Sequence, residues 1–334
     1  MYVPEKAFYW KTCGSGGLSP GKHLIVRKGW QAVVDKGKLT IFTPAYNRGY
    51  IIGRLYESLK KQTVYDFEWL VVDDGSTDET QELFEQWTQE KNPFLIRYYK
   101  VPNGGKHRAV NRGVELAQGD LFFIVDSDDY VTEDAVECIL QWERELPKDP
   151  AERFAGVAGA HGYPEGGMAG RGHGREYVDC TSQERLLYGI EGDKAEVFYT
   201  EILRQFPFPT FEGEKFLTES VVWFAIGAKG YKLRWYDRII TLGTYLEDGL
   251  TANNMELFYR NPRGYMLSLR SDLDYLPLSL KQRLGHYAAY VKTGRQLGIP
   301  FKELRLQLHV SALTLRIACL LKWGKERLTR KKPS

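Results

Sequence analysis

The chain has 334 residues, of which 43% are hydrophobic and 27% are charged. This composition is typical of a folded globular protein with a sizeable core and excludes a disordered chain. The four cysteines are far apart and predict neither a disulfide framework nor a zinc site. The sequence also shows no secretory signal and no apolar run long enough to cross a bilayer, so we expect a cytoplasmic protein.

The net charge of +3 is unevenly distributed along the chain. Residues 302–334 hold nine Lys and Arg against two Glu, a net charge of +7, which leaves about −4 on the rest. A basic end on a slightly acidic body argues against nucleic acid as a partner. Residues 301–323 predict one amphipathic helix. We therefore expect peripheral contact between this helix and the inner, anionic face of the membrane. The alternative is an ordinary helix that covers the core.

Residues 1–37 form a lead-in with little periodicity. Within it, residues 16–22 imitate a phosphate-binding G-x-x-x-x-G-K loop. However, His23 stands where that loop needs a hydroxyl group, and Pro20 removes one of its amides. The sequence therefore favours a flexible lead-in over a nucleotide-binding loop.

Apolar strands and amphipathic helices then alternate. This order predicts an α/β fold, in which helices flank both faces of a Rossmann-like, mostly parallel sheet. Residues 155–174 contain eight glycines and predict either a mobile loop beside the site or a plain surface insertion. The expected strands are 38–44, 67–72, 95–100 and 119–125, and the expected helices are 50–62, 77–87 and 106–117.

Polar clusters follow three of these strands, at residues 43–47, 73–74 and 126–128. Because ligands of such sheets bind outside the carboxyl ends of the strands, we expect the clusters to share one crevice. The spacing of Asp126 and Asp128 suits Mg²⁺ or Mn²⁺, which prefer oxygen ligands and complete their shells with phosphate and water. Alternatively, these aspartates cap a helix that begins near Thr132.

Four sequence blocks carry a resemblance to a known family. They are TIFTPAYNRGYIIGRLYESLKKQT, FEWLVVDDGSTDET, NGGKHRAVNRGVELAQGD and LFFIVDSDD. In this order, over residues 39–131, they resemble the inverting family 2 glycosyltransferases of the GT-A fold, in particular bacterial capsular and cell-surface polysaccharide members. The resemblance implies a GT-A domain at 38–245, divided into a nucleotide-binding half (38–131) and an acceptor half (132–245), followed by a C-terminal helical region (246–334).

The resemblance also implies the ligands. The donor would be a nucleotide diphosphate sugar, with UDP favoured, and the acceptor a carbohydrate or a lipid-linked molecule. Asp126 and Asp128 would hold the divalent metal, Mn²⁺ or Mg²⁺. Tyr46 would lie near the base, and Asp74 would accept a hydrogen bond from a ring N–H. The implied donor contacts are Thr43, Pro44, Ala45, Tyr46, Asn47, Asp73, Asp74, Gly105, Lys106, Asp126 and Ser127.

Glu219 is the expected catalytic base. Family members usually have Glu-Asp at this position, and here Thr218 replaces the Glu. Glu214 is the competing candidate, and a carboxylate here could instead be a first-turn charge that the helix dipole favours. Together with Glu214, Asp193 and Lys194 are expected in the sugar and acceptor pocket, and residues 245–251 are expected to form a lid.

Two rival functions remain at the level of sequence. A catalytically silent nucleotide-sugar binding module would keep Tyr46 and Asp74 but would need no base. A sugar nucleotidyltransferase needs a basic, glycine-rich turn after the first strand, where only Arg48 is basic. The chain also lacks the Q-x-x-R-W block of processive polymerases, which favours the addition of single sugars in polysaccharide or glycoconjugate synthesis.

Overall fold

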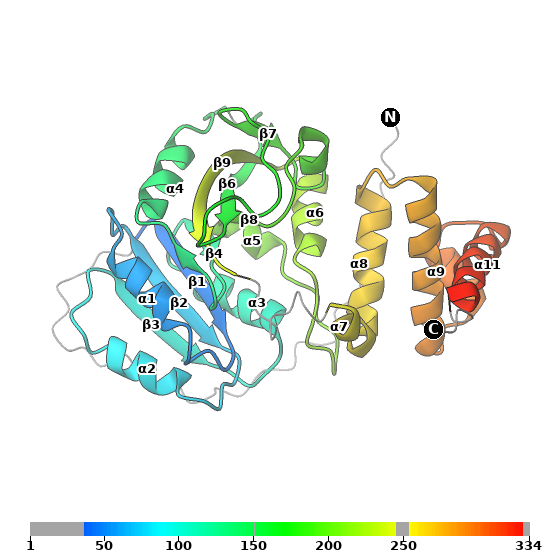
Figure 1. Ribbon diagram of the computed structural model, residues 1–334, viewed down its shortest axis with the longest axis horizontal. Coiled ribbons are helices and arrows are strands. Elements are labelled where there is room, and N and C mark those ends of the chain that lie inside the picture. Colours follow the sequence, from blue (N-terminus) through cyan, green and yellow to red (C-terminus); the bar gives the residue numbers. More distant parts are fainter. Residues whose placement is uncertain (1–36, 150, 245–253, 330–334) are drawn as a thin grey trace.

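The computed structural model of the chain describes residues 37–149, 151–244 and 254–329 (Figure 1). A mixed sheet of nine strands forms its centre, with the order β3-β2-β1-β4-β8-β6-β9-β5, and β7 pairs with β9. The strands are β1 (Leu39–Ala45), β2 (Phe67–Asp73), β3 (Leu95–Lys100), β4 (Leu121–Ile124), β5 (Tyr130–Val131), β6 (Phe154–Gly162), β7 (Val178–Cys180), β8 (Lys194–Tyr199) and β9 (Lys232–Leu242).

Helices cover both faces of this sheet, as the sequence predicts (Figure 1). Side chains alternate along each strand, so Ile41 of β1 packs into the core on one face and Phe42 into the core on the other. The first core includes side chains of α1 (Gly53–Lys60), α2 (Thr80–Trp87) and α4 (Ala135–Arg144). The second includes side chains of α3 (Lys106–Leu116), α5 (Thr200–Gln205) and α6 (Ser220–Ala228).

The prediction of a mostly parallel sheet holds only for its first half. Strands β1 to β4 pair in parallel. In the second half, β8 runs antiparallel to both β4 and β6, and β9 runs parallel to β6 but antiparallel to β5 and β7. Parallel strands need long crossovers, and the sequence after residue 131 shows no such regular alternation.

The glycine-rich segment 155–174 is not one loop, because its first residues belong to β6. There the glycines allow close packing: a Cβ at Gly159 would lie 2.7 Å from Cγ1 of Ile240 on the neighbouring strand. Glycine therefore marks a close approach of two strands rather than an irregular chain. The lead-in, apart from Gly37, and the expected lid at residues 245–251 lie outside the described residues.

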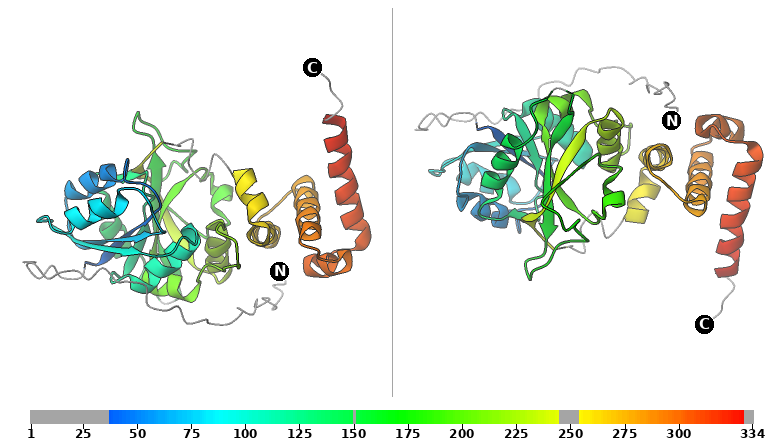
Figure 2. Two further views of the ribbon diagram at one scale, coloured as in Figure 1. Left: turned by 90° about the horizontal axis from the view of Figure 1, so that it is seen from below. Right: turned by 90° about the horizontal axis from the view of Figure 1, so that it is seen from above.

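A C-terminal group of helices extends from the part of the molecule that contains the sheet, as predicted, and has a core of its own (Figure 2). The helices are α7 (Asn254–Arg260), α8 (Pro262–Tyr275), α9 (Leu280–Gln296), α10 (Phe301–Leu308) and α11 (Ala312–Thr329). The single helix expected at 301–323 is wrong, because the chain breaks at His309, which has φ of 53°. Among the described helices none alone meets the length and composition of a membrane span, and α10 and α11 meet them only together, across a bend of 105°.

Candidate active site

The loops after β1 and β2 are joined by hydrogen bonds at the carboxyl edge of the sheet. The amide of Asn47 donates to the Ser76 hydroxyl (2.8 Å), and the side-chain oxygen of Asn47 accepts from the Thr77 amide (2.8 Å). Asn47 has φ of 51°, a conformation that asparagine tolerates better than most residues. Tyr46, in the same loop, leaves 49% of its surface exposed and is accessible to a ligand.

Asp74 joins the β2 loop to the start of α3. Its two carboxylate oxygens accept from the amides of Gly104 and Gly105, each at 2.7 Å. The side chain of Asn103 donates to one of these oxygens as well (3.1 Å). Burial raises the pKa of Asp74 despite the opposing effect of these donors. The sequence predicts that Asp74 binds the nucleobase of the donor. The structure shows that its carboxylate also fixes the loop before α3, which begins at Lys106.

Lys106 contacts both Asp126, a predicted metal ligand, and Glu219, the predicted catalytic base. Its ammonium nitrogen lies 2.7 Å from Oδ2 of Asp126 and 2.9 Å from Oε1 of Glu219. Burial alone would lower the pKa of Lys106, but the two carboxylates more than offset it, and the pKa is raised. Lys106 therefore stays charged between side chains that are 93 residues apart in the sequence.

The turn after β4 concentrates negative charge. Burial and the neighbouring Asp126 raise the pKa of Asp128. Burial, Asp126 and Asp128 also raise the pKa of Asp129, to about 8. The helix-capping alternative is wrong, because α4 begins only at Ala135 and its N-cap is Asp134.

The donor atoms of this turn fit a divalent cation. Carboxylates that repel one another are stabilised by a cation, and their oxygens are the ligands that Mg²⁺ and Mn²⁺ prefer. The described residues contain no group of three or more His, Cys, Asp or Glu side chains arranged to hold a metal. A divalent cation held by Asp126 and Asp128 with phosphate and water therefore stays a prediction.

The structure separates the two candidates for the base. Glu219 is the N-cap residue of α6, but its side chain makes no capping hydrogen bond. Its carboxylate forms an ion pair with Lys106 instead. Glu214 is buried, and its carboxylate accepts from the amides of Arg263 (2.9 Å) and Gly264 (2.8 Å) in the first turn of α8. Its carboxylate thereby stabilises the N-terminus of α8, which favours Glu219 as the base, while a pocket role for Glu214 stays a prediction.

Three predicted donor contacts have buried side chains. Thr43 and Asp73 are fully buried, and Ala45 is 2% exposed. The Thr43 hydroxyl accepts from the indole N–H of Trp69 (3.1 Å), while Asp73 accepts from the Ser76 amide (2.7 Å) and the Tyr98 hydroxyl. Their side chains are buried, so contact between these residues and the donor, which would have to use their main chains, stays a prediction. Ser127 is also buried, whereas Pro44 is partly exposed.

The predicted acceptor residues Asp193 and Lys194 have different surroundings. Lys194 donates to the main-chain oxygens of Ala169 (3.3 Å) and Glu191, and burial lowers its pKa. It therefore fixes the chain before β8. Asp193 is exposed, and after burial its negative charge is a further cause of the raised pKa of Asp129 and of Glu196.

Glu196 is a site residue that the sequence analysis missed. It shares a face of β8 with Phe198, whose ring stacks on Trp223 of α6 at 4.3 Å. Trp223 lies one turn after Glu219 and donates its amide to the Glu219 carbonyl (3.1 Å). Burial raises the pKa of Glu196 to about 7, with Arg185 opposing and Glu219 contributing. The sequence signal that could have identified Glu196 is its position two residues before Phe198, a buried aromatic residue on the same strand.

Part of the chain is similar to known proteins. Residues 40–151 match the model of the family described as glycosyl transferase family 2. Glycosyltransferase GlyG of Streptococcus pneumoniae is 33% identical over 111 residues, which are 33% of this chain and 36% of that protein. The GalNAc(5)-diNAcBac-PP-undecaprenol beta-1,3-glucosyltransferase of Campylobacter jejuni is 24% identical over 306 residues, 85% of this chain and 94% of that protein.

The fold is also found among solved structures. The crystal structure of S. aureus TarS 1-349 in complex with UDP-GlcNAc has a TM-score of 0.54 and 21% identity, and the match covers 81% of this chain and 78% of that one. This likeness confirms the predicted GT-A fold. The family match begins in β1 and includes the acidic turn after β4, so residues 40–151 resemble glycosyl transferase family 2 through the part of the chain that carries the candidate site.

Proposed function

We propose that the protein transfers a sugar from a nucleotide diphosphate sugar to a hydroxyl group of a carbohydrate or lipid-linked acceptor, with inversion at the anomeric carbon. The observation that carries the proposal is the position of Lys106, whose ammonium group contacts both Asp126 and Glu219. The ammonium group of Lys106 therefore lies between the expected site of the donor's phosphates and the expected catalytic base.

The described residues divide the chemistry between them. Glu219 accepts the proton of the acceptor hydroxyl as its oxygen attacks the anomeric carbon. Lys106 provides positive charge beside the diphosphate that leaves. Asp126 and Asp128 would hold a divalent cation, which when bound supplies further positive charge to the diphosphate. A single in-line displacement needs no covalent intermediate on a carboxylate, and it inverts the sugar.

The ligands are proposed from chemistry and from the comparisons. TarS was crystallised with UDP-GlcNAc, which supports a UDP-sugar donor here. The name of the Campylobacter jejuni relative, which matches most of this chain, includes an undecaprenol diphosphate acceptor. That name supports a lipid-linked acceptor and a role in polysaccharide or glycoconjugate synthesis. Mn²⁺ or Mg²⁺ is proposed because the acidic turn offers only carboxylate oxygens.

The test uses Glu219→Gln in the full chain, with Glu212→Gln as the matched control, because Glu212 is exposed in the preceding loop. UDP-sugars are screened for transfer or slow hydrolysis with and without Mn²⁺, and UDP binding is followed by thermal shift. We expect Glu219→Gln to lose about 10²–10⁴-fold in rate while it still binds UDP. The control should keep both properties.

Two results would contradict the proposal. Unchanged turnover in Glu219→Gln would show that another group accepts the proton. Release of pyrophosphate from a sugar phosphate and a nucleoside triphosphate would assign the site to a nucleotidyltransferase instead. Asp128→Asn tests the cation separately, since it should abolish the effect of Mn²⁺ on UDP binding.

A further inference from the structure

Helix α11 carries apolar side chains on two opposite faces. Leu315, Ala318 and Cys319 are buried in the core of the C-terminal helices. Four large side chains on the other face remain exposed, and we call them the α11 outer face. They are Leu313 (68% exposed), Ile317 (42%), Leu320 (68%) and Leu321 (56%).

The spacing of these residues places them on one stripe. Positions i, i+4, i+7 and i+8 lie on the same side of an α-helix. A helix that only covers a core normally presents polar residues outward, and contiguous exposed apolar side chains indicate a binding surface. Leu306 of α10 is also 53% exposed, so the apolar character extends beyond α11.

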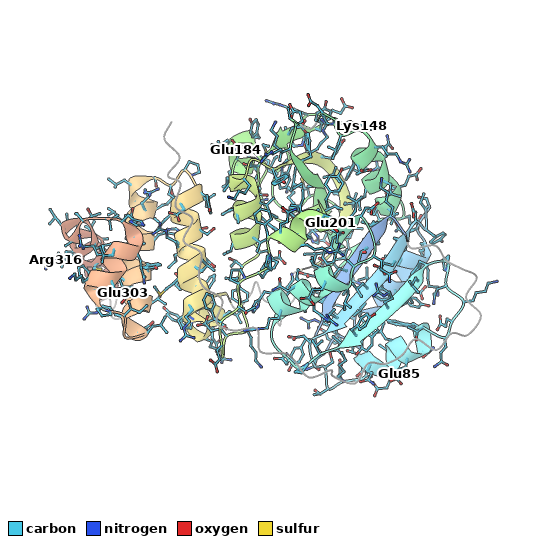
Figure 3. All side chains as sticks on the ribbon, turned by 180° about the vertical axis from the view of Figure 1, so that it is seen from behind. Glu85, Lys148, Glu184, Glu201, Glu303 and Arg316 are labelled. Atoms are coloured by element: carbon cyan, nitrogen blue, oxygen red, sulfur yellow. The ribbon has the colours of Figure 1, made fainter. Side chains whose placement is uncertain are left out.

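The surroundings of the α11 outer face are basic. Residues 302–334 carry a net charge of +7, and among the described side chains Lys302, Arg305 and Arg316 lie on α10 and α11. Arg316 lies at the end of the molecule farthest from the catalytic sheet (Figure 3). Both views of Figure 2 place α11 at the outer edge of the molecule. Apolar and positively charged side chains thus lie together at the outer end of the C-terminal helices.

We propose that the α11 outer face docks on the surface of an anionic lipid bilayer, with its aliphatic side chains at the acyl boundary and the basic residues at the headgroups. Basic amphipathic helices bind in this way, lying in the plane of the interface. Anionic headgroups add attraction for each nearby Lys and Arg. Pairing with a second copy of the same face is disfavoured, because two segments of charge +7 would be brought together.

The experiment measures flotation of the full chain with phosphatidylcholine vesicles, either alone or containing phosphatidylglycerol. The test variant is Leu313→Ser with Leu320→Ser. The matched control is Leu187→Ser with Leu280→Ser, which removes two leucines that are 69% and 74% exposed elsewhere. Hydrolysis of the donor without vesicles shows whether each variant keeps its fold and its active site.

We expect the wild type to bind only the vesicles with phosphatidylglycerol, and more weakly at high salt. The test variant should lose at least about tenfold in partition, while the control stays like the wild type. The proposal is overturned if the wild type does not float, or if both double variants bind equally. A dimer that the test variant abolishes, without vesicle binding by the wild type, would assign the face to a second copy. Because donor hydrolysis is measured separately, loss of vesicle binding does not affect the proposed function.

Discussion

Glu196 is an acidic side chain held among other acidic side chains. It lies on the strand face that packs against α6, and Glu219 and Asp193 both act on it. With its pKa raised to about 7, Glu196 binds a proton more tightly in the folded chain than in the unfolded chain. Its contribution to stability is therefore complete at low pH and is lost as the pH rises through about 7.

Glu196→Gln should remove this pH dependence. The glutamine keeps the shape and polarity but cannot ionise, so the variant should gain stability relative to wild type between about pH 4 and pH 8, by about 1–3 kcal/mol. Urea denaturation across this range measures the difference. Glu201→Gln is the control, because the Glu201 side chain is 77% exposed. Parallel curves for Glu196→Gln and wild type would rule out a buried, titrating Glu196.

At this scale, the sequence identified residue types better than it identified their partners. Polar residues at strand ends were predictable, because parallel strands end at one edge of the sheet. Whether such a side chain faces a ligand or the core depends on tertiary neighbours. Thr43 faces the Trp69 indole and is buried, whereas Tyr46, three residues on, is exposed.

Among the secondary-structure elements, α3 begins at a turn that requires glycine. Gly105 immediately precedes this helix with φ of 95°, and a Cβ there would lie 1.8 Å from the Lys215 carbonyl oxygen. Glycine is therefore required twice, by the backbone angle and by the approach of the 211–217 segment. The position of Lys106 depends directly on this turn.

Gly105→Ala should destabilise the chain by about 2–4 kcal/mol and weaken UDP binding, because either Lys106 or the 211–217 segment must move. Gly53→Ala in α1 is the control, because a Cβ there would have no other atom within 4 Å. Urea denaturation and UDP thermal shifts measure both effects. Equal stabilities for the two variants would show that the loop adapts without cost.

Elements with strong local signals agreed with the sequence, and those set by distant contacts did not. Helix α3 begins at Lys106 as expected, and the first four strands lie where their apolar runs predict them. The break at His309 has no proline or glycine to mark it. Similarly, the role of Glu214 depends on α8, whose amides the local sequence around residue 214 cannot reveal.

At the scale of the whole molecule, the C-terminal helices form a core separate from the two cores beside the sheet. They are attached through the segment before α6. The side-chain oxygen of Asn261 accepts from the amides of Lys215 (2.7 Å) and Phe216 (3.1 Å), and Glu214 caps α8. The segment that ends at the proposed base therefore rests on the helical region. The spacing of apolar residues at 301–323 and the family resemblance predicted a helical region, but not this attachment.

Leu315→Ala tests whether the helical core is a separate unit. Leu315 is fully buried in that core, so its truncation should cost about 2–5 kcal/mol of local stability. Leu313→Ala, on the exposed face of the same helix, is the control and should cost little. We expect hydrogen exchange to quicken in α8 to α11 while the strands β1 to β4 and the UDP thermal shift stay unchanged. Faster exchange throughout the sheet would instead show that the helical region and the catalytic half unfold together, and that the active site depends on both.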